Sequence, residues 1–72
     1  MEADQWGRRI RAFRKLKGFT QQKFARHVGV SVSVLGDIER GNRVPDDVLV
    51  ADIARSLDVT IEELTPSKHK ER

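Results

Sequence analysis

The chain has 72 residues, a formal net charge of +3 and no cysteine, and 38% of its residues are hydrophobic. A chain of this length has room for one domain with a small core, and the lack of cysteine excludes disulfides and thiolate metal sites. No run approaches the roughly 20 apolar residues of a membrane span, and the N-terminus MEADQWGRRI lacks the basic-then-apolar order of a signal peptide. We therefore expect a cytoplasmic protein with no membrane segment.

Charge is distributed unevenly along the chain. Residues 1–30 hold eight Lys or Arg and two acids, whereas residues 31–66 hold three Arg and eight acids. One explanation is that these charges lie on solvated helix faces and only keep a small domain soluble. A basic half is also attracted to phosphate, however, and an acidic half is expected to face away from it or toward another protein.

The first predicted helix begins near Asp4 and is ended by Gly18. Basic residues crowd its last turn, where the helix dipole favours them. Trp6 could stack on a ligand, but an aromatic residue at helical spacing is more often a core residue. The stripe that we expect to be buried consists of Trp6, Ile10, Phe13 and Leu16.

Residues 21–40 have the outline of two short helices joined by a tight turn. Thr20 is suited to cap the first of them, and Gly29 can turn the chain at positive φ. Ser31 is suited to cap the second, which we expect to run over residues 32–40. Its inward face would carry Leu35 and Ile38, and its outward face Val32, Ser33, Gly36, Asp37 and Arg40.

One segment argues against a helix at this point. Residues 30–34, Val-Ser-Val-Ser-Val, alternate with the period of a strand, and Gly36 costs about 1 kcal/mol relative to alanine inside a helix. We favour the helix because Leu35 and Ile38 fit a buried helical face and because the alternation is short.

Two further helices are predicted beyond a loop at residues 42–44. Asp46, next to Pro45, is suited to cap the fourth helix, and Thr60 with Glu63 forms a capping box for a short fifth helix. The fourth helix would bury Leu49, Val50, Ile53, Ala54 and Leu57. Residues 67–72, SKHKER, have nothing to bury, and we expect a flexible basic tail there.

A set of residues spread over most of the chain forms a recognisable pattern. It consists of Arg14 in the first helix, Thr20-Gln21 opening the second, Ala25 where the helices cross, Gly29 in the turn, Ile38-Glu39-Arg40-Gly41 closing the third, and Ile53-Ala54 with Leu57 and Val59. Over roughly residues 5–64 this pattern resembles the Cro-type, xenobiotic-response-element family of phage-repressor-like proteins. The resemblance implies an all-α, compact five-helix DNA-binding domain over residues 1–66, with its helix-turn-helix at residues 21–40.

The resemblance also implies a function. The chain would be a sequence-specific DNA-binding transcriptional regulator, a repressor that binds a two-fold operator as a homodimer with its third helix in the major groove. Base reading would fall to Gln21, Val32, Ser33 and Asp37, and phosphate contacts to Thr20, Ser31, Arg40, Asn42 and Arg43. The family pattern pairs Arg14 with Glu39 in a buried ion pair, and two exposed charges are the alternative.

The expected reading surface departs from the long amides and cations that are usual in the family. Val32 could touch a thymine methyl, Ser33 could bond several base edges, and Asp37 could accept from a cytosine amine. Asp37 could equally form an interaction within the protein and read no base. Such a surface should depend heavily on groove shape and phosphate contacts.

A second function stays open beside the first. Gly36, Asp37 and the acidic half also suit a protein-binding adaptor or an antitoxin module that retains the helix-turn-helix fold. Dimers in the family often form through the fourth and fifth helices, although burial in the core competes for each candidate residue. Those candidates are Leu49, Val50, Ile61 and Leu64.

No catalytic constellation stands out in the sequence. His27 lies near a predicted helix end and His69 in the tail, and neither has a cysteine or a nucleophilic serine at a telling spacing. We therefore expect no enzymatic activity, no cofactor and no metal.

Overall fold

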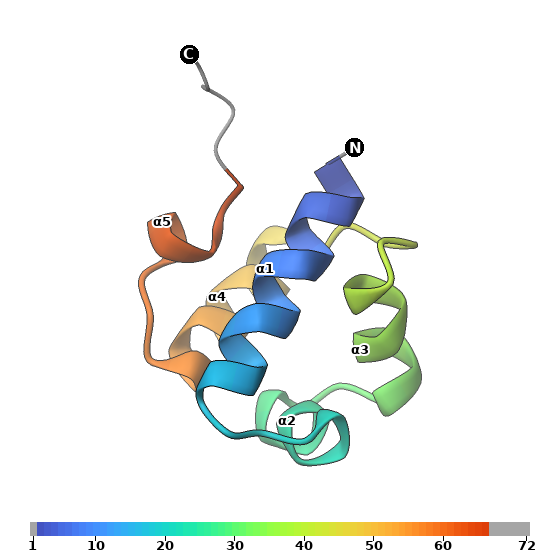
Figure 1. Cartoon of the computed structure of the whole chain (residues 1–72), viewed down its shortest axis with the longest axis vertical. Helices are drawn as coiled ribbons and strands as arrows, with labels where there is room; N and C mark the ends of the chain where they lie inside the picture. Colours follow the sequence, from blue (N-terminus) through green and yellow to red (C-terminus); the bar gives the residue numbers. More distant parts are fainter. Residues whose placement is uncertain (1, 67–72) are drawn as a thin grey trace.

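The computed structural model describes residues 2–66, which form five α-helices and no strand (Figure 1). The helices are α1 (Glu2–Leu16), α2 (Gln21–Val28), α3 (Val32–Glu39), α4 (Asp47–Leu57) and α5 (Ile61–Leu64). The all-α, five-helix prediction is confirmed. The predicted tail at residues 67–72 lies outside the described residues. Within residues 2–66 no helix is long and apolar enough to cross a bilayer.

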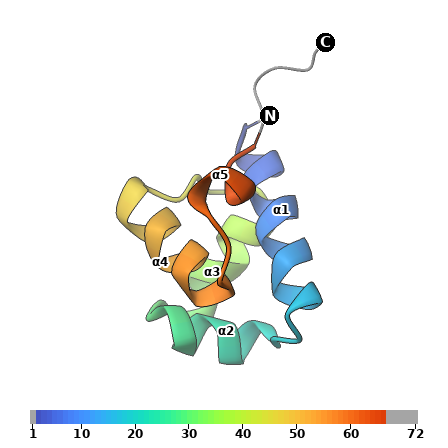
Figure 2. The same cartoon turned by 90° about the vertical axis from the view of Figure 1, so that its left-hand side faces the viewer.

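The helix α1 runs along the molecule between α3 on one side and α5 on the other, with α2 at one end (Figure 1). The view at right angles to this one places α4 on the far side of the molecule from α1 (Figure 2). Both α1 and α2 pack against α3, while α4 packs against α2 and α5. This arrangement leaves one side of α3 as an outer face of the molecule.

Apolar side chains from all five helices meet in one core. A core shared in this way fixes the angle between the short helices, none of which would be stable alone. Phe13, Val30, Val34 and Leu49 are partly buried at its edge. The buried members are Trp6, Ile10, Phe24, Ala25, Leu35, Ile38, Val50, Ile53, Ala54, Leu57 and Leu64.

Each of the helices α2 to α5 begins at a side-chain cap. The hydroxyl of Thr20 accepts from the Lys23 backbone N–H at 3.1 Å, and that of Ser31 accepts from the Val34 N–H at 3.1 Å. The predicted caps of α4 and α5, Asp46 and Thr60, are also present, as is the capping box at α5. Caps of this kind contribute about 1 kcal/mol each, a sizeable share for a small domain.

The capping box of α5 has an electrostatic consequence for its carboxylate. The backbone N–H of Thr60 donates to Glu63 at 2.8 Å. This hydrogen bond, with a further one from the Thr60 hydroxyl and the field of Lys17, lowers the pKa of the exposed Glu63 carboxyl below its ordinary value.

The strand-like segment at residues 30–34 is not a strand. Gly29 turns the chain at φ 97°, Ser31 caps α3, and Val34 lies inside the helix. Val30 and Val34 pack against the edge of the core, so tertiary burial outweighs their β-branched preference. The helix ends at Glu39, and Arg40 is its C-cap rather than its last helical residue.

The helix α1 differs from its prediction at both ends. It begins at Glu2 rather than near Asp4, and it ends at Leu16. Leu16, which we expected to be buried, is 76% exposed. The reason is geometric, because each step of three residues falls about 60° short of a full turn at 3.6 residues per turn. The stripe therefore rotates away from the core before it reaches Leu16.

Candidate nucleic-acid interface

The third helix is held in place by an ion pair with the first. Arg14 Nε donates to Glu39 Oε2 at 2.7 Å, and Arg14 Nη2 donates to Glu39 Oε1 at 3.1 Å. The two side chains are only 10% and 4% exposed. Arg14 Nη1 also donates to the carbonyl oxygen of Phe19 at 2.9 Å, in the loop before α2. The alternative of two exposed charges is therefore wrong, and one guanidinium joins α1, α3 and the loop between α1 and α2.

Gln21 belongs to the same network. Its side-chain Nε2 donates to Glu39 Oε1 at 3.1 Å, so both carboxylate oxygens of Glu39 accept hydrogen bonds. The sequence analysis expects Gln21 to contact a DNA base, and it does not predict this hydrogen bond to Glu39. It ties the first turn of α2 to the last turn of α3, which fixes the two helices of the motif relative to each other.

The outward face of α3 is open to solvent. Val32 is 40% exposed, Ser33 is exposed, and the side chain of Asp37 is 39% exposed one turn further along. These three predicted base readers therefore share one accessible face of a short helix. A duplex groove could reach all of them without any rearrangement of the fold.

Asp37 forms an interaction within the protein, as the alternative from the sequence allowed. Arg40 Nη2 donates to Asp37 Oδ1 at 2.7 Å, and the Arg40 side chain is 63% exposed. An exposed pair like this one contributes little to stability. Its effect is electrostatic, because the guanidinium offsets the carboxylate that would otherwise repel a phosphate backbone.

Gly36 is not on the open surface, contrary to the prediction for the outward face. It is buried beneath the side chain of Arg40, whose Nη1 would lie 2.9 Å from a Cβ at this position. Arg40 follows Gly36 by four residues, so the two positions are neighbours on the same side of α3. The absence of a side chain at Gly36 lets the guanidinium lie across the helix.

Replacing Gly36 by alanine should stabilise the free protein. The added Cβ would meet only the far end of the Arg40 side chain, which can swing away, and alanine is favoured over glycine inside a helix by about 1 kcal/mol. We expect Gly36→Ala to raise the melting temperature by about 4–8 °C for a domain of this size. Thermal denaturation followed by circular dichroism measures this, and a lower melting temperature would mean that Arg40 cannot leave its position.

The predicted phosphate contacts lie at the two ends of the motif. Thr20 and Ser31 are exposed as well as capping, and Asn42 and Arg43 are exposed in the loop that follows α3. The hydroxyls of Thr20 and Ser31 already accept backbone bonds, and each can still donate one hydrogen bond to a phosphate oxygen.

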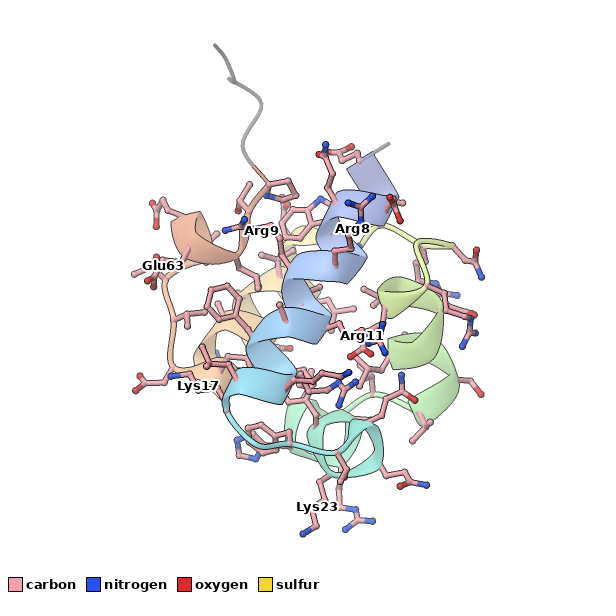
Figure 3. All side chains as sticks on the ribbon, viewed as in Figure 1. Arg8, Arg9, Arg11, Lys17, Lys23 and Glu63 are labelled. Carbon is pink, nitrogen blue, oxygen red and sulfur yellow. The ribbon has the colours of Figure 1, made fainter. Side chains whose placement is uncertain are left out.

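Part of the basic half is used inside the fold. Arg8 pairs with Asp4, and Arg9 donates to the carbonyl oxygens of Glu63 and Leu64 at the end of α5. Figure 3 shows Arg9 directed from α1 toward α5. Within residues 2–66, the cations whose side chains form no internal ion pair or hydrogen bond are Arg11, Lys15, Lys17, Lys23, Arg26 and Arg43.

Gly7 is a site that the sequence pattern did not single out. A Cβ at this position would lie 2.6 Å from the carbonyl oxygen of Glu39 and closer still to that of Ile38. The backbone of α1 therefore touches the last turn of α3 here, two turns away from the Arg14–Glu39 bond. No local pattern could have revealed this contact, because it joins residues distant in the sequence.

The candidates for a dimer surface divide into two groups. Val50 is 5% exposed and Leu64 is fully buried, so both belong to the core and cannot meet a second chain. Each lies four residues after the cap of its helix, Asp46 or Thr60, on the face that is turned toward the core. Ile61 is 48% exposed, and Leu49 is partly buried. Val48, which was not predicted, is 72% exposed on α4.

Comparison with known proteins gives a consistent result. A helix-turn-helix family model, HTH_3, matches residues 10–64. The chain is 59% identical over 66 residues to the uncharacterized HTH-type transcriptional regulator YazB of Bacillus subtilis (strain 168), covering 92% of this chain and 96% of that protein. It is 34% identical over 65 residues to the HTH-type transcriptional regulator SinR of the same organism, covering 89% of this chain and 59% of SinR.

A solved structure has the same arrangement of helices. The restriction-modification controller protein C.AhdI from Aeromonas hydrophila superposes with a TM-score of 0.82 at 34% sequence identity. The match covers 86% of this chain and 94% of that one.

Proposed function

This chain belongs to the HTH_3 helix-turn-helix family and is a DNA-binding transcription regulator, and from this premise we propose that it acts as a homodimer on a two-fold operator. The observation that supports the proposal is the outward face of α3, which is exposed and held rigidly by the buried Arg14–Glu39 pair. A short helix presented in this way fits the major groove of B-DNA.

The proposed base readers are Val32, Ser33 and Asp37, with Gln21 at the edge of the groove. Their side chains are short, so few direct hydrogen bonds to bases are available. Asp37 becomes tolerable near phosphate because Arg40 lies 2.7 Å away. Specificity of this kind would rest on a small number of base contacts together with the shape of the groove.

The proposed phosphate contacts flank these readers. Thr20 and Ser31 precede α2 and α3, whose first backbone N–H groups point toward an anion placed there. Arg40, Asn42 and Arg43 follow α3 and supply two cations. Such contacts fix the register of the protein on the duplex and carry little sequence information themselves.

The proposed dimer uses the side of the molecule formed by α4 and α5 (Figure 2). Its support is the exposure of Val48 and Ile61, at 72% and 48%. Leu49 can contribute at the edge, while Val50 and Leu64 hold the core beneath. A two-fold dimer would place two copies of α3 about 34 Å apart, one turn of the duplex.

Two substitutions test which residues contact bases and which contact phosphates. Arg43→Ala should weaken binding to operator and random duplex alike and reduce the log-log salt slope by about one per subunit. Ser33→Ala should change the preference between related operators by up to about tenfold, because a base contact is lost. Titration of labelled duplexes at several salt concentrations measures both effects.

The same titrations examine the rest of the proposal. The dimer requires two chains per operator at saturation. Equal losses on operator and random duplex for both variants would contradict the assignment of Ser33. If the unaltered chain bound no duplex at low salt, a protein-binding adaptor or antitoxin module would be the better description.

A further inference from the structure

A polar hollow lies where α1, α2 and α3 meet. It has a volume of about 390 Å³ and is lined by Arg11, Arg14, Gln21, Glu39 and Arg40. Three of these five side chains are arginines: Arg11 and Arg14 come from α1, and Arg40 is the C-cap of α3. The hollow lies beside the first turn of α2 and the last turn of α3, at the edge of the proposed reading surface.

The charges around the hollow do not cancel. Glu39 is neutralised by Arg14, because its carboxylate accepts two bonds from that guanidinium and one from Gln21. Arg40 is balanced by Asp37 at 2.7 Å. Arg11 has no ion pair or hydrogen bond within the described part of the chain. The hollow therefore carries an excess positive charge that belongs to Arg11.

The side chain of Arg11 is placed where it can meet a negatively charged ligand. Figure 3 shows its side chain directed from α1 toward α3, whereas Lys17, near the end of the same helix, lies on the opposite side, toward α5. Arg11 is exposed, so its guanidinium can meet a ligand without removing an existing internal partner. Arg40 also lines the hollow, and its side chain is 63% exposed.

We propose that this hollow is a subsite for one phosphate of the DNA backbone and that Arg11 is the residue that binds it. The proposal rests on the proposed function, because it assumes a duplex against α3. A guanidinium presents its N–H donors in a fixed fork that matches two oxygens of a phosphate. Arg14 and Gln21 also line the hollow, and their bonds to Glu39 hold them in place without a ligand. A helix outside the helix-turn-helix thereby contributes to DNA binding.

Salt dependence gives a direct test. Removing one phosphate contact from each subunit of a dimer should reduce the log-log slope of affinity against salt by about 1.8, so that between 50 and 200 mM salt Arg11→Ala loses about twelvefold less affinity than the parent. The matched control is Lys17→Ala, which removes the same charge just beyond the end of α1, on the side away from the hollow (Figure 3). It should leave the slope unchanged. Arg11→Lys should retain the slope, since it keeps the charge.

Replacement of single phosphates locates the contact. In a duplex carrying a neutral methylphosphonate at the position that Arg11 binds in each of the two half-sites, the parent and Arg11→Ala should bind equally well. Unchanged melting temperatures would verify that both variants are folded. Equal slopes for Arg11→Ala and Lys17→Ala would overturn the subsite while leaving operator binding intact, whereas failure of the parent to bind any duplex would instead overturn the proposed function.

Discussion

Replacing Gly7 by alanine should destabilise the domain by about 3 kcal/mol, at the upper end of the usual cost of overpacking. The new methyl carbon would lie 2.6 Å from the Glu39 carbonyl oxygen and closer to that of Ile38. Both obstacles are backbone atoms at the end of α3, so no side chain can rotate out of the way. Relief requires α1 to move away from α3. For a domain of this size the melting temperature should fall by about 12–24 °C.

The control for this substitution is Gly36→Ala. Both changes add one methyl group to a buried helical glycine, and alanine is favoured over glycine within a helix at both positions. At position 36 the obstacle is the mobile end of Arg40, whereas at position 7 it is the main chain. Thermal denaturation of the two variants should therefore give shifts of opposite sign. A Gly7→Ala variant as stable as the parent would show that the two helices can separate at little cost.

Glu39→Ala should destabilise the domain by about 3–5 kcal/mol, because it leaves the buried guanidinium of Arg14 without its counter-charge. Arg14 would keep only the bond to the Phe19 carbonyl oxygen, at 2.9 Å. Gln21 would lose its partner as well. In a small domain with a modest free energy of unfolding, a loss of this size removes most of the folded population at moderate temperature. Urea unfolding at 25 °C measures the difference.

Two comparisons separate the effect of burial from the effect of charge. Asp52→Ala removes one partner of the exposed Arg55–Asp52 pair, whose side chains are 74% and 34% exposed, and should cost no more than about 1 kcal/mol. Replacing Arg14 and Glu39 together by methionine should restore much of the stability, since neither buried charge is then left alone. An unchanged melting temperature for Glu39→Ala would contradict the structural role of the pair.

The helix boundaries could be predicted closely because their signals are local. Thr20, Ser31, Asp46 and Thr60 each cap the helix that the sequence assigned to them. Gly29 has the positive φ expected of a turn glycine. A cap requires only neighbouring residues to satisfy free backbone N–H groups, so its pattern can be recognised before any tertiary contact is known.

The features that escaped prediction all depend on tertiary contacts. Gly7 matters because it contacts the backbone of α3, which is distant in the sequence. The burial of Gly36 depends on the position of the Arg40 side chain. Arg9, counted among the basic residues of the first half, instead binds the carbonyl end of α5. Composition could show that the first half is basic. It could not show which cations the fold itself uses.

The helix α1 is attached at three places to two different parts of the molecule. Gly7 and Arg14 hold the last turn of α3, and Arg9 holds the end of α5. One rigid rod therefore connects the surface proposed for reading DNA with the surface proposed for pairing two subunits. Because α1 is fixed to both, the fold itself sets the angle between these two surfaces, and with it the angle at which each copy would meet the groove.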